Sequence, residues 1–179
     1  MISKTAFPGL DVLAADESLR GLESLLVRLQ KRQRLAKLAE KMAHRYERIF
    51  IDCPPVLNEI SAQAIRAASC VIVPIPPSPL SSRAFELVVR EIGANTKRRP
   101  PILPVLSMVD RRRKLHCEEL EKHPNWPVIP LASAMEQCAV RRQPVAAFAP
   151  NSPAASSLGR LWTAVESRLL EDAGSSLDR

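Results

Sequence analysis

The sequence predicts an α/β fold in which helices flank a mostly parallel, twisted β-sheet. Three short apolar runs, at 48–53, 70–75 and 101–109, are rich in β-branched residues and are followed by proline or aspartate. Continuous runs of this kind are typical of strands that are buried on both faces, as in parallel sheets. Helical segments separate the runs, and this alternation indicates one layered α/β domain at 1–171 with a polar tail at 172–179.

The N-terminal part predicts a short strand and a long basic helix. Residues 10–15 follow a Pro-Gly turn and predict the strand. Residues 18–46 predict the helix, because leucines recur at the spacing of one apolar helical face. The opposite face is basic and carries Arg28, Lys31, Arg32, Arg34, Lys37, Lys41 and Arg45. A basic amphipathic helix is typical of a surface that meets nucleic acid or a membrane, and equally of a packed helix with a solvated outer face.

The rest of the chain alternates between helices and strands. Besides the runs at 70–75 and 101–109, a shorter run at 128–131 predicts a strand. Apolar spacing predicts helices at 59–68, 81–92, 115–122 and 157–170, the last with Trp162 in the core. A helix or loop at 132–142 and a proline-containing loop at 146–153 precede that last helix. Because ligands bind beyond the carboxyl ends of strands in open α/β sheets, the residues at the strand ends are the candidates for chemistry.

The composition is that of a globular protein with a strongly basic balance. Of its 179 residues, 46% are hydrophobic and 25% are charged, which excludes wholesale disorder. A net charge of +7 favours encounters with polyanions such as nucleic acid. The four cysteines form no CxxC pair and the N-terminus lacks the pattern of a signal peptide, so we expect reduced thiols and a cytoplasmic location.

Several sequence blocks occur in a recognisable order along most of the chain. They read YERIFIDCPP at 46–55, AASCVIVP at 67–74, LPVLSMVDRR at 103–112, and then VIP, PV and PNSPAA between residues 128 and 155. This series resembles the ParA/MinD family of partition ATPases, whose motifs include YDxIIIDCPP and AADxVLIPV. The similarity extends from about residue 7 to residue 170, and it implies a P-loop NTPase-like fold.

The resemblance implies a switch that depends on ATP and Mg²⁺. Members of the family bind ATP–Mg as a sandwich dimer, bind DNA or a membrane in that state, and release it after hydrolysis. By this resemblance, Asp52 is the aspartate that holds a magnesium-bound water, and Pro54 and Pro55 form the switch segment. Asp110, together with Met108, falls where the family contacts adenine, and Pro130 opens the loop that flanks the base.

Three consecutive arginines follow the third apolar run. Arg111, Arg112 and Arg113 fall near a position where some members of the family place arginine against DNA phosphates. The guanidinium fork matches phosphate oxygens, although a solvated basic loop has the same appearance in a sequence. The expected partners are a second copy of the chain, DNA bound without sequence preference and a stimulating protein of the ParB type. DNA is favoured over a membrane, and the expected location is the cytoplasm, on the nucleoid.

The sequence departs from the family at the phosphate-binding loop. Its five glycines stand far apart, so neither GxxxxGK[ST] nor the family's KGGxGKT can be written anywhere in it. The resemblance starts near the middle of the family's domain, and we therefore expect an N-terminally truncated version of the fold. Two explanations stay open: a truncated form of a competent ATPase, or a non-catalytic, basic module that binds DNA or a partner. In either case we do not expect this polypeptide alone to hydrolyse ATP.

Overall fold

The computed structural model describes residues 2–15, 21, 24, 33–53, 58–95 and 100–177. These residues form two compact units, Met1–Ala67 and Ala68–Arg179. The organisation as one domain at 1–171 stays a prediction.

The first unit contains a small antiparallel hairpin. Strand β1 (Ile2–Lys4) pairs with β2 (Asp11–Leu13). Gly9 lies in the connecting turn with φ +80°, a conformation that glycine adopts without a steric penalty. The strand predicted at 10–15 is therefore confirmed as the shorter β2, whereas β1 was not predicted from the sequence.

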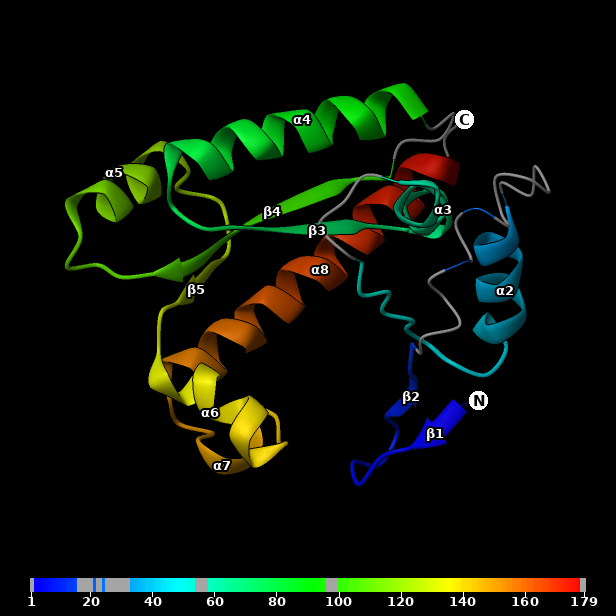
Figure 1. The fold of residues 1–179 in the computed structure, drawn as a ribbon, viewed down its shortest axis with the longest axis horizontal. Coiled ribbons are helices and arrows are strands. Elements are labelled where there is room, and N and C mark those ends of the chain that lie inside the picture. The colour runs from blue at the N-terminus through cyan, green and yellow to red at the C-terminus, as the bar shows by residue number, and fades with distance from the viewer. Residues whose placement is uncertain are drawn as a thin grey trace. The chain divides into compact units, whose positions relative to one another are not determined.

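Two helices complete the described part of the first unit (Figure 1). Helix α2 (Arg34–Ala43) confirms part of the helix predicted at 18–46, and most of the remainder of that prediction lies outside the described residues. Helix α3 (Glu59–Ala67) confirms the helix predicted at 59–68. Asn58 stabilises its first turn, because its side-chain oxygen accepts two backbone N–H bonds at 3.0 Å.

The strand predicted at 48–53 is wrong. These residues have no regular secondary structure, and the side chains of Ile49, Phe50 and Ile51 are exposed, that of Phe50 to 69%. An apolar, β-branched run forms a strand only where a neighbouring strand takes up its backbone hydrogen bonds. No described strand pairs with this segment.

The second unit contains a parallel sheet of three strands. Strands β3 (Val71–Ile75), β4 (Ile102–Val109) and β5 (Val128–Pro130) lie in the order β3-β4-β5. β4 is central and pairs in parallel with both neighbours. This confirms the three strands predicted here and the predicted parallel α/β sheet.

Helices connect and cover these strands. Figure 1 shows α4 (Pro79–Asn95) and α8 (Pro153–Leu177) on opposite sides of the sheet. Three helices are shorter. In the sequence, α5 (Lys114–Lys122) connects β4 to β5, and α6 (Ser133–Arg141) and α7 (Val145–Phe148) follow β5. The predicted helices of this unit are confirmed, with α4 and α8 longer than expected.

Three details of the C-terminal region differ from the sequence expectations. The predicted loop at 146–153 includes most of the one-turn helix α7. The predicted polar tail at 172–179 is helical as far as Leu177. Trp162 is 44% exposed and not a core residue, since its neighbour Leu161 takes the position that faces the core.

The core of the second unit lies between the sheet and α8. Leu103 and Val105, two residues apart on one face of β4, pack with Ile129 and Val165. Further apolar side chains surround them, namely Cys70, Ile72, Met135, Leu158, Leu161, Ala164 and Leu169. This packing fixes the strands and leaves their carboxyl ends at one edge of the sheet. Among the described residues, no helix is both long enough and apolar enough to cross a membrane.

Candidate functional site

The carboxyl ends of β4 and β5 bring three of the candidate residues together. Val109, the last residue of β4, lies opposite Pro130, the last residue of β5. Met108 and Asp110 flank Val109 in the chain, so they share this edge of the sheet with Pro130. The order of strands in the sequence was enough to predict this grouping.

A bulge in β4 determines how Met108 is presented. Leu106 lies opposite Val128 and Val109 lies opposite Pro130, so three steps along β4 correspond to two along β5. Met108 has φ 56°, in the left-handed region that residues with a Cβ rarely adopt, and its side chain is 51% exposed. Strained residues of this kind cluster at binding sites.

Asp110 is tied to Arg112 through both carboxylate oxygens. Oδ1 accepts the backbone N–H of Arg112 at 3.0 Å and its Nε–H at 2.9 Å, and Oδ2 accepts Nη2–H at 2.9 Å. The Asp110 side chain is only 15% exposed, whereas that of Arg112 is 88% exposed. These bonds to Arg112 lower the pKa of Asp110 to about 2. The edge of the sheet therefore carries a persistent carboxylate with its counter-ion on the solvent side.

His116 holds the backbone of Asp110 from the other side. The Asp110 N–H donates to His116 Nδ1 at 3.0 Å, and the imidazole is buried in the first turns of α5. The ring therefore carries its proton on Nε2 when it accepts this bond. This role of His116 was not predicted from the sequence. No motif marks it, because the contact depends on how α5 returns toward the end of β4.

The three arginines have different environments within the loop between β4 and α5. All three are exposed, but the guanidinium of Arg112 is committed to Asp110. Among the described residues, no side chain pairs with the guanidinium groups of Arg111 and Arg113. These two arginines are the ones that remain for an external anion.

Comparison with known proteins identifies the family. A family model described as "AAA domain" matches residues 1–103, which is more than half of the chain. The chain belongs to the ParA/MinD family of P-loop NTPases. This confirms the resemblance that the sequence blocks carry.

Curated relatives of this chain include proteins named as chromosome partitioning proteins. The chain is 36% identical over 119 residues to the chromosome partitioning protein ParA of Caulobacter vibrioides, which covers 63% of this chain and 45% of that protein. It is 25% identical over 164 residues to the sporulation initiation inhibitor protein Soj of Bacillus subtilis, which covers 85% of this chain and 65% of Soj. The chain thus spans about half the length of the Caulobacter relative.

A solved structure shows the same fold. The cell division ATPase MinD of Pyrococcus furiosus aligns with 97% of this chain and 69% of its own chain, with a TM-score of 0.63 and 20% sequence identity. This alignment supports the P-loop NTPase-like α/β class.

The described residues do not fit the triphosphate–magnesium part of the family's cofactor. Asp52 is exposed in the irregular segment of the first unit, and Pro54 and Pro55 lie outside the described residues. Within the described part of the chain, no group of three or more histidine, cysteine, aspartate or glutamate side chains could hold a metal ion. The sequence contains no glycine-rich loop to surround phosphates. The residues expected at the base of the nucleotide are different. Met108 and Pro130 offer apolar contacts and Asp110 offers a polar contact at the same edge of the sheet.

The low pKa of Asp110 predicts a pH dependence of stability. A carboxyl group whose pKa falls from 3.8 to about 2 on folding stabilises the fold above pH 4, and this contribution is lost as the pH falls from about 4 to about 2. In Arg112→Met, which lacks the guanidinium, we expect the pKa of Asp110 to rise toward its usual value. Carboxyl chemical shifts followed by NMR measure this directly. A titration of Asp110 that is the same in both proteins would contradict the assignment of Arg112 as the cause.

Proposed function

We propose that this chain is a ParA-type protein of DNA partitioning or positioning and that it recognises adenine at the carboxyl edge of β4 and β5. The relatives support the biological role, since they are named as chromosome partitioning proteins. The geometry of Met108, Asp110 and Pro130 supports the site.

The observation that carries the proposal is the bulge that turns Met108 outward beside Asp110. A flexible thioether and a proline ring are suited to the flat faces of a purine. A carboxylate accepts a hydrogen bond from the amino group of adenine, whereas guanine presents an oxygen at the equivalent position. Guanine offers a carboxylate its N1–H and 2-amino group instead, so Asp110 selects adenine only where it faces position 6 of the purine, which is the contact that we propose.

The proposal also includes the wider activity of the family. ATP–Mg as the cofactor, Asp52 as the residue behind a magnesium-bound water, a homodimer and a stimulating partner of the ParB type are proposed for the whole protein. Arg111 and Arg113 are proposed to contact DNA phosphates, and the location is proposed to be the cytoplasm at the nucleoid. We assign no step of hydrolysis to these residues, since those described do not fit a bound triphosphate.

Calorimetric titration with adenosine, ATP and guanosine tests the adenine site. We expect adenosine and ATP to bind with similar affinity, unchanged by Mg²⁺, because these residues contact the base and not the phosphates. Guanosine should bind more weakly. Asp110→Ala should weaken adenosine binding about 10- to 100-fold, the range for losing a hydrogen bond to a charged group.

Glu118→Ala is the matched control, because Glu118 is a carboxylate on the neighbouring helix α5, 46% exposed, with one long contact of 3.8 Å to Lys114. It should bind adenosine as the unmodified chain does. Equal losses in the two variants would contradict a specific role for Asp110. No detectable binding of adenosine would contradict the site.

One observation favours a second function. Arg112 occupies both carboxylate oxygens of Asp110, which is the arrangement expected if this carboxylate only orders the basic loop. The alternative is a non-catalytic module that binds DNA or a protein partner and ignores nucleotides. It predicts DNA binding that adenosine and ATP leave unchanged.

A further inference from the structure

The carboxylate of Asp110 has one hydrogen-bond position left open. An ionised carboxylate accepts about four hydrogen bonds, two at each oxygen. In Asp110, Oδ1 accepts the backbone N–H of Arg112 at 3.0 Å and its Nε–H at 2.9 Å, and Oδ2 accepts Nη2–H at 2.9 Å. Among the described residues, no other group donates to either oxygen. A ligand can therefore add a single hydrogen bond, at Oδ2, while this pairing lasts.

Arg112 holds the carboxylate through two parallel bonds. Its Nε–H and Nη2–H reach one oxygen each, which is the strong, directional fork geometry of an arginine–carboxylate pair. The two residues are separated by one residue in the chain, and the backbone N–H of Arg112 also binds Oδ1, so the arginine is tethered beside its partner. The Asp110 side chain is 15% exposed, and that of Arg112 is 88% exposed. A ligand that approaches from solvent meets a carboxylate already paired with this guanidinium.

Guanine presents the same pattern of donors as an arginine fork. Its N1–H and 2-amino group lie side by side and donate two parallel hydrogen bonds, so they need both oxygens of a carboxylate. A guanine base shifted until this edge met Asp110 would compete with Arg112 for the same two oxygens. Adenine donates from its 6-amino group alone and needs one acceptor position. The paired carboxylate thus fits adenine and does not fit the donor edge of guanine.

We propose that Arg112 determines the specificity of the adenine site by excluding guanine from Asp110. The guanidinium occupies the two oxygens together, as the guanine edge would, and leaves open at Oδ2 the one position that the adenine amino group uses. Arg112 acts through Asp110 and not on the base, so it is a positioning residue. Its role rests on the proposed adenine site and adds the residue that sets the selectivity of that site.

Calorimetric titration of the full chain and of Arg112→Met with adenosine and guanosine tests this role. Methionine removes the fork from a side chain that is 88% exposed, so the fold should persist, and circular dichroism verifies this. We expect guanosine to bind Arg112→Met about 10-fold more tightly than it binds the unmodified chain, within the range for a two-bond contact to a base. The affinity for adenosine should change by less than about threefold, because its position at Oδ2 is open in both proteins.

Inosine and a lysine variant identify the fork as the cause. Inosine has N1–H but no 2-amino group, so its gain of affinity in Arg112→Met should be smaller than that of guanosine. Arg112→Lys keeps the charge, but an ammonium group lacks the planar fork. This variant should also bind guanosine more tightly than the unmodified chain does. If it kept the full discrimination, charge and not the fork would be the cause, and the proposal would be overturned.

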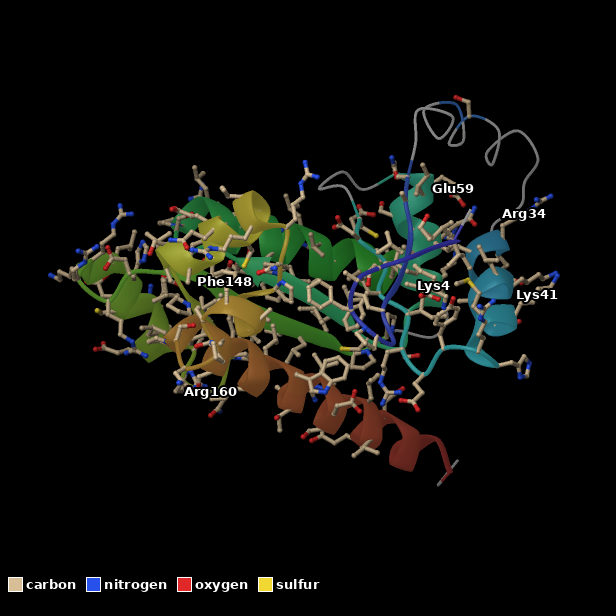
Figure 2. All side chains as sticks on the ribbon, turned by 90° about the horizontal axis from the view of Figure 1, so that it is seen from below. Lys4, Arg34, Lys41, Glu59, Phe148 and Arg160 are labelled. Atoms are coloured by element: carbon tan, nitrogen blue, oxygen red, sulfur yellow. The ribbon has the colours of Figure 1, made fainter. Side chains whose placement is uncertain are left out.

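Arg34→Met is the matched control. It removes the same kind of side chain from an exposed position in the first turn of α2, which belongs to the first unit (Figure 2). The ratio of the adenosine and guanosine affinities should equal that of the unmodified chain. An equal change of this ratio in Arg34→Met and Arg112→Met would contradict a specific role for Arg112.

The adenine site and the role of Arg112 fail in different ways. If no protein binds adenosine, the adenine site is contradicted, and the role of Arg112 with it. If the unmodified chain binds adenosine but does not prefer it to guanosine, or if Arg112→Met keeps the same preference, the role of Arg112 is wrong and adenosine binding still stands. The same conclusion follows if both nucleosides lose affinity together, which is the result expected of an arginine that only stabilises the loop.

Discussion

Leu106→Ala is expected to lower the free energy of unfolding of the second unit by about 2–5 kcal/mol, the range for truncating a buried leucine. Leu106 is 1% exposed and lies in the central strand, opposite Ile75 on β3 and Val128 on β5. The truncation leaves a cavity where both strand pairs meet, and domains of this size have only about 5–15 kcal/mol of stability in total. The carboxyl end of β4 lies directly beyond Leu106, so we expect the truncation to make Met108 and Asp110 of the candidate site less well ordered.

Leu80→Ala provides the matched control for Leu106→Ala. It removes the same atoms from a side chain that is 76% exposed on α4, and its effect should stay within about 0.5 kcal/mol. Urea unfolding followed by tryptophan fluorescence measures both variants, because Trp126 and Trp162 are the chain's two tryptophans and both lie in the second unit. Similar losses in the two variants would contradict the burial of Leu106 in the central strand.

The second unit was largely predictable because its strands follow the rule that continuous apolar runs form strands buried on both faces of a parallel sheet. The runs at 70–75 and 101–109 are apolar on both faces, and helices cover both sides of the sheet that they form. The run at 48–53 has a similar apolar centre at Ile49, Phe50 and Ile51, yet it forms no strand. Its pattern indicates side chains that avoid water. A strand also needs a neighbouring strand to pair with its backbone N–H and C=O groups, and an apolar pattern does not show whether such a neighbour is present.

The candidate site was predictable in position but not in geometry. The order of the elements places Met108, Asp110 and Pro130 at one edge of the sheet. The positive φ of Met108 could not be predicted, because its side chain is one that normally avoids this conformation. The pairing of Asp110 with Arg112 was equally hidden, since Arg111 and Arg113 are chemically identical neighbours. Which arginine turns back is decided by the path of the loop.

His116→Leu is expected to destabilise the second unit by about 1–3 kcal/mol, the penalty for leaving a buried hydrogen-bonding group without its partner. The N–H of Asp110 would lose the His116 Nδ1 acceptor that it contacts at 3.0 Å. Leucine fills most of the buried space, so the main loss is this hydrogen bond. We therefore expect faster hydrogen exchange at the Asp110 amide and weaker binding of adenosine, because the carboxylate would no longer be held at the edge of the sheet.

His116→Asn separates positioning from packing. The side-chain oxygen of asparagine can take the place of Nδ1, although the smaller side chain leaves a cavity in a position that is 6% exposed. This variant should keep the slow exchange of the Asp110 amide and most of the affinity for adenosine, even where it lowers the unfolding free energy. If both variants lost slow exchange equally, His116 would position Asp110 only through the packing of its imidazole ring. If instead only His116→Leu lost it, the hydrogen bond from α5 to the end of β4 would be what positions Asp110.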